Sequence, residues 1–393
     1  REIPDGRWTC TNYLDYYDDQ RMKIYACPLT LIKEGNGLLF DFTGSSKQAP
    51  AVVNATYAAT EGYLLRAMLG LFGFAVSHCP AAIQRVMRIK AELGTIVHCA
   101  WPAGVCKGTT SVTQSVWQAA TFCLSQMLLG SEKYGARAMA VSRGHLLILD
   151  VLGQDQYGVP FAAVLQDCCQ AAGSAAGVAA NGIDTGGIPE PEVSIPNVEG
   201  NEFRYPILYL YRRQEADSGG PGKFRGGVGL SMAFMPHDVP EISDMVIHTH
   251  GVTFPSALGL SGGYPGSLNR ITIKRETNIQ ALFQGGTMPR SLTEIGGQEE
   301  LPPPFTHTFL RAGSVVECVG GGGGGYGDPL ERAPEAVAED VVNGLVSQAA
   351  AREQYGVVID GERGVDRDAT GREQATVKTQ RQSPARNPTQ RLQ

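Results

Sequence analysis

A glycine-rich segment with two cations is the first part of the sequence that could bind a ligand. It reads Asp217-Ser218-Gly219-Gly220-Pro221-Gly222-Lys223-Phe224-Arg225-Gly226-Gly227-Val228-Gly229. Backbone N–H groups of such a loop can form a concave array, which beside Lys223 and Arg225 would hold a phosphate or carboxylate. The segment is not a Walker A loop, because no Gly-Lys-Ser/Thr ends it. The candidate residues for this role are Ser218, Gly219, Gly220, Lys223, Arg225, Gly226 and Gly227.

The same composition has a purely structural interpretation. Glycine supplies the positive φ that tight turns between strands require, and a buried arginine needs a carboxylate partner. In that alternative Arg225 pairs with an acidic residue of the core and binds no ligand. Composition by itself favours this alternative over the phosphate loop, and both remain open at the level of the sequence.

Two further elements combine glycine or hydroxyl groups with possible ligand contacts. Residues 320–325 are six consecutive glycines, followed by Tyr326. Such a run loses much entropy when it becomes ordered, so it is either a linker or a place where backbone approaches another group closely. Tyr326 and the Asp-Pro turn after it favour an ordered loop. The additional candidates for binding a phosphate or an intermediate are Gly323, Gly324, Gly325, Tyr326, Asp41, Thr43 and Ser45.

The histidines offer little to a metal ion. All seven are dispersed except His248 and His250, which strand geometry would place on one face with Asp244 nearby. Histidine pairs on strands more often pack than ligate. We therefore predict no metal site in this chain, and His248 and His250 would be the ligands if it held one.

Hydrophobic periodicity predicts an α+β fold. Residues 22–42 alternate around a Glu-Gly-Asn-Gly turn and indicate a β-hairpin. The spacing of apolar residues favours helices over 53–74, 80–93, 112–129, 159–180 and 333–355. Strands are expected at 145–152, 205–212, 228–236, 242–249, 269–275 and 306–318. The first half should pack helices on a mixed sheet, and the second half should be rich in strands punctuated by glycine.

These elements suggest four consecutive regions. Residues 1–180 form a hairpin with a helical α+β region, and residues 181–330 form a β-rich, glycine-rich region. Residues 331–361 form a C-terminal helix with a proline at its start. Residues 362–393 are polar, lack aromatic side chains and show no periodicity, so we predict a disordered tail.

Charge and composition exclude several classes of protein. The formal net charge of −6 argues against a nucleic-acid or membrane-surface partner. The longest apolar stretch, residues 63–76, contains an arginine and falls short of the roughly 18 to 20 residues that span a bilayer. Nine cysteines without a CxxC pair indicate reduced thiols. We expect a cytoplasmic protein.

The order of the glycine and hydroxyl motifs resembles the hydantoinase B, oxoprolinase and ketone carboxylase family. The motifs are Asp41-Phe42-Thr43-Gly44-Ser45-Ser46, Gly94-Thr95-Ile96-Val97, Asp217-Ser218-Gly219-Gly220, Phe224-Arg225-Gly226-Gly227 and Gly322-Gly323-Gly324-Gly325-Tyr326-Gly327-Asp328-Pro329. The ending, from Val346-Ser347 to Gly356-Val357-Val358, is also similar to that family. Segments 184–187, 196–199 and 205–213 look closer to its acetophenone carboxylase-like members.

The resemblance implies an enzyme subunit that is active only in a complex. Family members pair with a hydantoinase A-like subunit, which binds ATP and Mg and activates a carbonyl by phosphorylation. This implies a biotin-independent, ATP-dependent carboxylase (a ligase) acting on an aromatic ketone and bicarbonate. Two alternatives are an ATP-dependent amidohydrolase for a hydantoin, lactam or 5-oxoproline ring, and a non-catalytic scaffold subunit.

The resemblance also implies a second partner. In the family a long N-terminal portion with a His/Asp-rich segment precedes the part that this chain resembles. The chain opens with Arg1 and has no initiator Met. This start is typical of a processed chain or of a segment. We therefore expect either that another polypeptide carries that portion, together with any Mn or Zn, or that the portion was lost.

Overall fold

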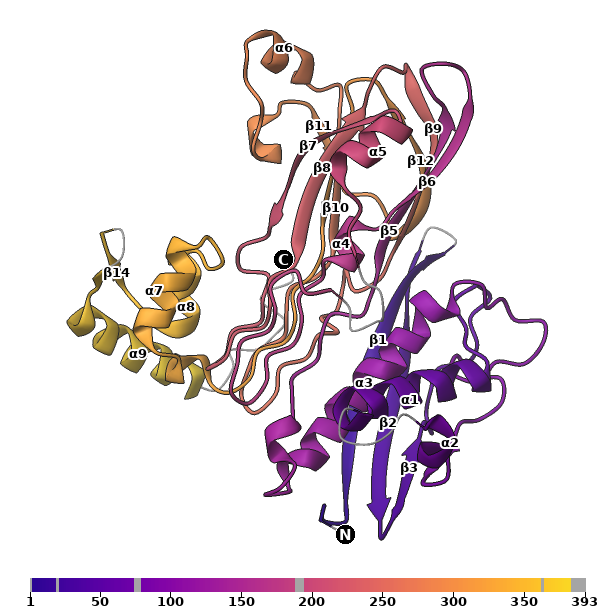
Figure 1. Ribbon diagram of the computed structural model, residues 1–393, viewed down its shortest axis with the longest axis vertical. Coiled ribbons are helices and arrows are strands. Elements are labelled where there is room, and N and C mark those ends of the chain that lie inside the picture. The colour runs from indigo at the N-terminus through magenta and orange to yellow at the C-terminus, as the bar shows by residue number, and fades with distance from the viewer. Residues whose placement is uncertain (1, 19–20, 74–78, 188–193, 362–363, 383–393) are drawn as a thin grey trace.

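The computed structural model describes residues 2–18, 21–73, 79–187, 194–361 and 364–382. It contains both helices and sheets, as the sequence predicts. Figure 1 shows an N-terminal unit, a β-sandwich, a bundle of extended segments that continues the sandwich strands, and a group of C-terminal helices.

The N-terminal unit is a four-stranded sheet covered by helices on one face. Its strands lie in the order β1 (Gly6–Asp18), β2 (Arg21–Glu34), β3 (Gly37–Asp41) and β4 (Met87–Lys90). Helices α1 (Tyr57–Phe72) and α3 (Val112–Leu129) pack over alternate buried residues such as Cys10, Leu29 and Phe40. The predicted hairpin at 22–42 and both helices are confirmed, and Gly35 supplies the left-handed turn residue at φ 57°.

The helix predicted over 80–93 was wrong. The chain forms only the short helix α2 (Pro80–Gln84) and then β4, which pairs in parallel with β3. Met87 and Ile89 alternate with exposed Arg88 and Lys90. This alternation of period two prevails over the helical spacing because β3 offers a free edge.

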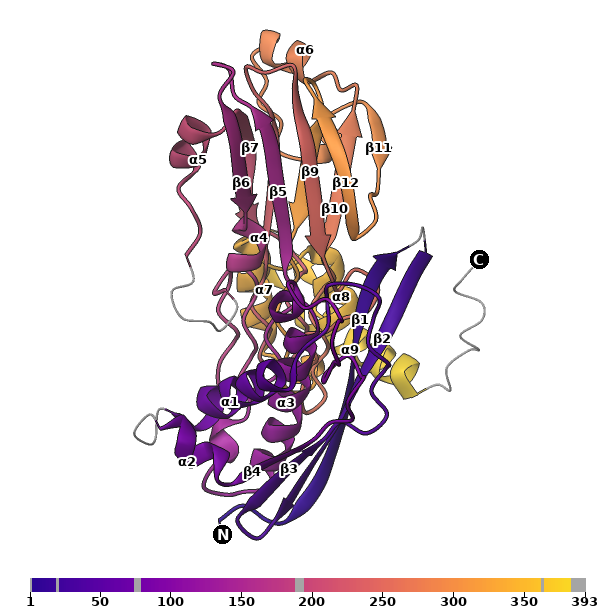
Figure 2. The same cartoon turned by 90° about the vertical axis from the view of Figure 1, so that its right-hand side faces the viewer.

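Two sheets form the sandwich seen at the top of Figure 2. One has the order β11 (Gln298–Glu300), β10 (Arg270–Arg275), β13 (Val315–Val319), β8 (Leu230–Pro236) and β7 (Ile207–Gln214). The other has the order β12 (Phe305–Arg311), β9 (Glu241–Thr249), β5 (Leu147–Gln154) and β6 (Pro160–Leu165). Apolar side chains of both sheets share one core. Short helices α5 (Val198–Arg204) and α6 (Ile279–Gln284) lie outside it.

The sandwich confirms the predicted strands and corrects one helix. The strand predicted over 306–318 is two strands, β12 and β13. The Ala-rich segment 159–180, predicted as a helix, instead forms β6, the single helical turn α4 (Asp167–Gln170) and an extended stretch. The small side chains of this segment allow neighbouring backbones to pack closely. They do not form the packing face of a helix. Strand β5 pairs with β9 on one side and with β6 on the other, so the sheet crosses the boundary predicted at residue 180.

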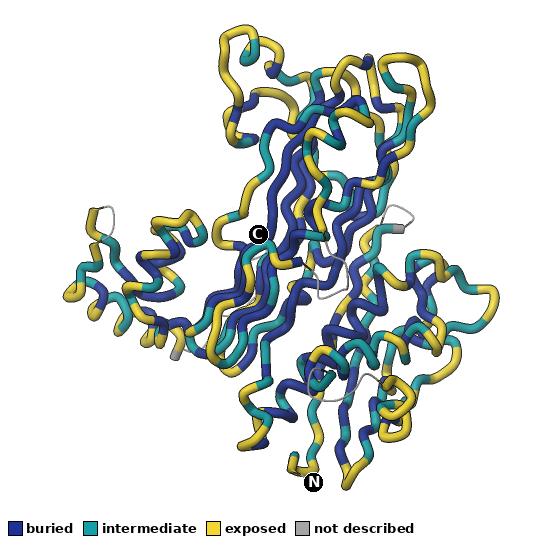
Figure 3. The backbone as a smooth tube through the Cα atoms, in the orientation of Figure 1, coloured by how far each residue is buried: buried dark blue, intermediate teal, exposed yellow. Residues whose placement is uncertain are grey.

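Five extended segments pack backbone against backbone below the sandwich, and we call them the glycine bundle. They are residues 139–146, 171–187, 217–229, 256–267 and 320–327. A Cβ atom built on Gly322, Gly323 or Gly324 would lie 2.0–2.2 Å from a carbonyl oxygen of Ser218, Ser174 or Leu258, respectively. Residues 320–325 are buried throughout, and Figure 3 shows the bundle as a partly buried region below the sandwich. Only glycine fits at such positions.

The bundle has the hydrogen-bond pattern of polyproline-II-like chains. Successive amides of Gly323, Gly324 and Gly325 donate to the carbonyls of Gly227, Val141 and Tyr264, each on a different neighbour. A helix with three residues per turn points successive amides in three directions. This explains why each amide donates to a different neighbouring segment. The ordered-loop interpretation of residues 320–325 is therefore confirmed, and the group that approaches them is other backbone.

The C-terminal region is a small group of helices. The predicted helix 333–355 is divided into α7 (Pro334–Val342) and α8 (Gln348–Tyr355), which ends at left-handed Gly356. The two-stranded pair β14 (Ile359–Asp360) and β15 (Gly364–Val365) follows. The disorder predicted for 362–393 was wrong for α9 (Arg367–Gln382), while residues 362–363 and 383–393 lie outside the described part. Among the residues of α9 whose burial is described, only Thr370 and Val377 are buried, too few to form an apolar stripe.

We expect Gly323→Ala to abolish or severely weaken folding. The new Cβ would meet the Ser174 carbonyl carbon and oxygen, which are backbone atoms held by the bundle, and the expected loss of unfolding free energy is at least about 3 kcal/mol. Thermal unfolding followed by circular dichroism would measure it. The matched control is Gly177→Ala, because a Cβ there meets nothing within 4 Å. Equal stability of the two variants would contradict the steric interpretation of the bundle.

Candidate functional site

The predicted phosphate-binding glycines lie inside the glycine bundle. The amides of Gly220, Gly226 and Gly227 donate to carbonyls of Gly323, Gly220 and Ser174. The amides of Gly323, Gly324 and Gly325 are engaged in the same way. Gly219 packs against the backbone of Gly226. The Ser218 hydroxyl donates to the Glu215 carbonyl and accepts from the Gly229 amide. The structure brings these glycines together, and their amides donate to other backbone groups.

Arg225 is the centre of a buried ion-pair network. It is 2% exposed, and its Nη1 lies 2.8 Å from Asp184 Oδ1 while its Nε lies 3.4 Å from Asp340 Oδ2. Arg332 donates to the same Asp340 carboxylate at 2.7 Å. Burial would lower the pKa of Arg225, but the hydrogen bond to Asp184 and the charge of Asp340 raise it above its ordinary value.

This network matches the structural alternative for Arg225. The guanidinium links the bundle to Asp184 and, through Asp340, to helix α7. The role of Arg225 in binding a phosphate or intermediate stays a prediction. Sequence reasoning did not find Asp184, Asp340 or Arg332 as its partners, because they lie 41, 115 and 107 positions away and carry no local motif.

Lys223 faces a pocket at the end of the bundle. The pocket has a volume of about 470 Å³, and its polar lining is Asn181, Lys223, Glu331 and Arg332. The Lys223 ammonium lies 3.4 Å from Glu331, and both side chains are about half exposed. Tyr326 is half-buried and pairs through its backbone with Phe224, which also lines the pocket. Of the predicted cations, Lys223 is the one that a small anionic ligand in this pocket would meet directly.

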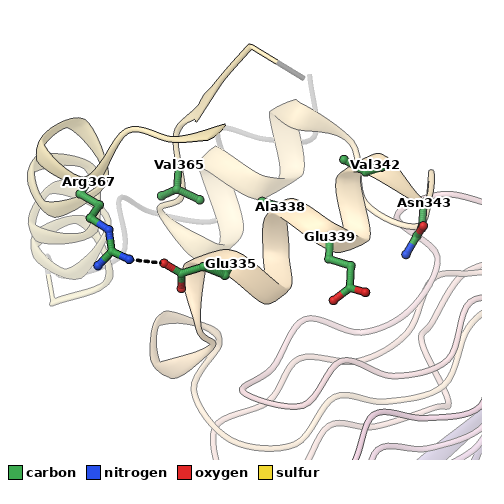
Figure 4. A pocket seen from close by; sticks show the side chains of 7 residues that line it. All are labelled: Glu335, Ala338, Glu339, Val342, Asn343, Val365 and Arg367. Atoms are coloured by element: carbon green, nitrogen blue, oxygen red, sulfur yellow. Dashed lines mark hydrogen bonds and ion pairs between the residues drawn. The ribbon is translucent and has the colours of Figure 1, made fainter. Parts of the chain in front are cut away.

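A neighbouring pocket contains none of the predicted residues. It has a volume of about 460 Å³ beside α7, and Figure 4 shows Glu335 and Glu339 on its wall with Arg367 from α9. Arg367 is paired with Glu335 at 2.6 Å. Two carboxylates with one paired arginine do not suit an anionic ligand.

The Asp41, Thr43 and Ser45 candidates form a closed turn on the N-terminal unit. Asp41 accepts from the amide and hydroxyl of Thr43 and pairs with Lys90 at 3.1 Å. Ser45 donates to the Phe42 carbonyl. Hydrogen bonds and the ion pair to Lys90 lower the pKa of Asp41, against the opposing effect of burial, which is the largest single influence. Within the described ranges these three side chains form no hydrogen bond with the bundle.

A buried histidine cluster joins the N-terminal unit to the sandwich. His250 Nδ1 donates to the Asp15 carbonyl at 2.6 Å, and its Nε2 accepts from Ser111 at 2.8 Å. His145 bonds to Ser115 of α3 at 2.9 Å. His248 packs its ring 5.3 Å from that of His250, and neither of its ring nitrogens has a partner among the described residues. The sequence indicated His248 and His250 as neighbours but not His145, Ser111, Ser115 or Asp15.

The environment of the cluster keeps all three imidazoles neutral. Burial lowers the pKa of His248 to about 2 and that of His145 well below its ordinary value, and the charge of Arg143 contributes at His145. Burial also lowers the pKa of His250, partly opposed by Asp15. Arg143 is fully buried beside them and donates to the carbonyls of His250 and Gly251.

The cluster does not have the geometry of a catalytic relay or of a metal centre. The Asp15 carboxylate accepts from the amides of Gly251, Val252 and Thr253 and lies 3.9 Å from His250 Nδ1, so it does not orient the ring. Asp244 pairs with His307 instead of the cluster. Among the described residues no group of three or more His, Cys, Asp or Glu is arranged to hold a metal ion.

Comparison with known proteins places this fold and its motifs in a family. The sequence pattern described as Hydantoinase B/oxoprolinase matches residues 1–329. The chain is 29% identical over 390 residues to the acetophenone carboxylase delta subunit of Aromatoleum aromaticum, covering 94% of this chain and 55% of that protein. It is 35% identical over 174 residues to the caprolactamase subunit beta of Pseudomonas jessenii, covering 44% and 27%.

Solved structures share the fold. A nucleotide-free acetone carboxylase structure superposes with a TM-score of 0.84 at 22% identity, over 99% of this chain and 54% of that one. A caprolactamase from Pseudomonas jessenii gives 0.73 at 23% identity, over 95% and 61%. The protein belongs to the hydantoinase B/oxoprolinase family, as its motifs predicted. It spans about half the length of several relatives. No helix in the described ranges is long and apolar enough to cross a membrane.

We expect Arg225→Met to destabilise the fold strongly. Removing the guanidinium leaves half-buried Asp184 without its ion pair and leaves buried Asp340 with Arg332 alone, and breaking such a buried network costs about 3 kcal/mol. Urea unfolding would measure the change. The control is Lys223→Met, whose exposed ion pair should change stability by no more than about 0.5 kcal/mol. A small change in the free energy of unfolding of Arg225→Met would mean that the fold does not depend on this ion-pair network.

Stability should fall on mild acidification because of the histidine cluster. The folded-state pKa of His248 lies below its ordinary value of 6.5, so the unfolded chain binds more protons below that pH. The free energy of unfolding should therefore decrease from pH 7 to pH 5, by up to about 1.4 kcal/mol per pH unit for each buried histidine.

The variant His248→Phe should make this pH dependence shallower, because a ring of similar size without titratable nitrogens packs against Phe305. Urea unfolding at several pH values is the measurement. The exposed His307→Gln serves as the control for the loss of one histidine outside the cluster. An unchanged slope in His248→Phe would show that His248 does not govern the acid response.

Proposed function

We propose that this chain is a subunit of an ATP-dependent, biotin-independent carboxylase that acts on a ketone, with an aromatic ketone as the preferred substrate. The observation that carries the proposal is the match to the acetophenone carboxylase delta subunit, which extends over 94% of the chain. The shared fold with acetone carboxylase is consistent with it. The chain spans about half the length of each of these two proteins.

The assembly that we propose contains two further components. A hydantoinase A-like subunit would bind ATP and Mg and phosphorylate the substrates. A polypeptide equivalent to the part of the relatives outside this match would carry any Mn or Zn. The histidine cluster does not supply such a site, because both ring nitrogens of His250 are engaged.

Lys223 is the residue of this chain that we propose to contact the phosphorylated intermediates of the reaction. A ketone carboxylase of this kind must handle an enol phosphate and carboxyphosphate, which are anionic and react readily with water. A cation at the mouth of a pocket stabilises such charge. Lys223 lies at the pocket of about 470 Å³, whereas Arg225 is committed to Asp184 and Asp340.

An amidohydrolase is the second candidate. The caprolactamase subunit beta is more similar residue by residue, at 35% identity, although over only 44% of the chain. ATP-dependent opening of a lactam also proceeds through an activated carbonyl. Substrate therefore distinguishes the two candidates better than sequence identity does.

The decisive measurement is substrate-dependent ATP hydrolysis by the assembled complex. We expect release of phosphate with acetophenone or acetone plus bicarbonate, and incorporation of labelled bicarbonate into a carboxylic acid. Turnover with caprolactam or a hydantoin, and none with ketone plus bicarbonate, would refute the carboxylase and support the amidohydrolase.

Within that complex, Lys223→Ala should lower kcat/KM by at least about tenfold, roughly 1.4 kcal/mol of transition-state stabilisation, without loss of assembly. Lys47→Ala is a matched control, because Lys47 is an exposed lysine that lines neither of the two pockets near α7. Normal turnover by Lys223→Ala in an intact complex would favour the scaffold alternative.

A further inference from the structure

The side chain of Asn181 has a fixed orientation in the wall of the pocket that Lys223 faces. Its Oδ1 accepts two hydrogen bonds, from the Arg225 amide at 3.0 Å and from Arg332 Nη1 at 2.8 Å. Both partners are N–H donors, so only the oxygen of the Asn181 amide can occupy this position. In the described ranges the Nδ2 group has no hydrogen-bond partner. Because Asn181 is exposed and lines the pocket, this NH2 group can donate to a ligand there.

Arg332 holds Asn181 and the backbone of Lys223 in fixed positions relative to each other. The Nη1 atom that donates to Asn181 also donates to the Lys223 carbonyl at 3.1 Å. Asp340 accepts from Nη2 at 2.7 Å, and Arg332 is only 5% exposed. A buried guanidinium that is bound at both ends keeps the groups around it in place. The ion-pair network of Arg225, Arg332 and Asp340 thus forms a rigid base for two donor residues of the pocket.

The pocket combines these two donors with an apolar lining. Besides Asn181, Lys223, Glu331 and Arg332, the lining consists of Phe224, Ala179, Ala180, Ala333 and Ala336. An ammonium group beside a neutral N–H donor binds an oxyanion through charge-assisted hydrogen bonds. The small apolar side chains and the ring can contact the hydrocarbon part of a ligand. The volume of about 470 Å³ lies in the range of pockets that hold small organic molecules.

Glu331 is the group with which an oxyanion would compete for Lys223. Its Oε2 lies 3.4 Å from the Lys223 ammonium, and the two side chains are 62% and 48% exposed. An exposed ion pair of this kind contributes at most about 1 kcal/mol to stability. A ligand can therefore displace the Glu331 carboxylate from Lys223 at small cost.

We propose that Asn181 and Lys223 bind one oxyanion group, a phosphate or a carboxylate, of a ligand with an apolar body. The oxygens of this group accept from Asn181 Nδ2 and from the Lys223 ammonium, and the apolar body lies against Phe224 and the alanines. The inference rests on the proposed function for the site at Lys223, and it adds Asn181 as a second contact and the class of ligand. The phosphorylated aryl intermediate and the aryl carboxylic acid product of the proposed reaction both belong to this class.

Calorimetric titration of the purified chain with phenyl phosphate and with benzoate tests the class of ligand. We expect at least one of them to bind at least about tenfold more tightly than acetophenone, which lacks the oxyanion, and than inorganic phosphate, which lacks the apolar body. Binding of phenyl phosphate alone would identify the phosphate as the ligand group, and binding of benzoate alone would identify the carboxylate. Affinities no higher than those of acetophenone and inorganic phosphate would overturn the proposal.

The variant Asn181→Asp tests the role of the amide group. It keeps an oxygen for the Arg225 amide and for Arg332, but an oxygen that repels an oxyanion takes the place of the NH2 donor. The affinity for the tighter of the two ligands should fall at least about tenfold, with an unchanged melting temperature. Asn343→Asp is the matched control, because it adds the same charge at the neighbouring pocket, and it should leave the affinity unchanged. Equal affinities of wild type and Asn181→Asp would refute the contact.

The variant Glu331→Gln should have the opposite effect. It removes the carboxylate that competes for the Lys223 ammonium, so the affinity should rise by about threefold. Glu331 is mostly exposed, so the substitution does not disturb the fold. A lower affinity in Glu331→Gln would overturn Lys223 as a contact of the oxyanion.

The two proposals can fail separately. Ligand binding that Asn181→Asp abolishes, in a chain whose complex carboxylates no ketone, would preserve this inference and refute the proposed function. Ketone carboxylation with a kcat/KM that Asn181→Asp leaves unchanged would refute this inference and preserve the proposed function.

Discussion

Backbone-to-backbone contact in the glycine bundle is the constraint on which the rest of the structure depends. Its segments continue β5, β8, β10 and β13 of the sandwich at one end and lead into α7 at the other. Because a Cβ at Gly226 or Gly323 would fall 2.0 Å from a carbonyl oxygen, the spacing between these segments is fixed by atomic radii. The bundle fixes the relative positions of both sandwich sheets, the C-terminal helices and the pocket at Lys223.

Two buried polar contacts attach the neighbouring units to this rigid centre in different ways. The C-terminal helices are attached by charge, since Arg225 and Arg332 share Asp340 of α7. The N-terminal unit is attached by neutral groups, since His250 and His145 bond to residues of β1 and α3. The neutral contact weakens as histidine begins to titrate in the unfolded chain, because burial lowers the pKa of these histidines in the folded protein.

Sequence reasoning succeeded where side-chain periodicity governs structure and failed where backbone contact does. The hairpin, α1, α3 and most sandwich strands follow from alternation or helical spacing of apolar residues. The Ala-rich segment 159–180 looked helical because alanine has high helix propensity, yet its small size serves the bundle. The polar helix α9 has no stripe to detect. Among site residues, a carboxylate partner for Arg225 was foreseen as an alternative, but Asp184 and Asp340 could be identified only from the tertiary structure.

The position of the polyglycine run in the chain has a consequence for biosynthesis. Residues 320–327 donate to or accept from segments that begin nearly two hundred positions earlier, so the centre cannot close until the ribosome has released residue 327. Until then the waiting segments present peptide groups to water in place of apolar side chains, and peptide groups are well solvated in an extended conformation. A nascent chain of this kind can remain partly unfolded without exposing the hydrophobic surface that usually leads to chaperone binding or aggregation. The glycines thus lower the risk of aggregation during this delay and also allow the final close packing of backbones.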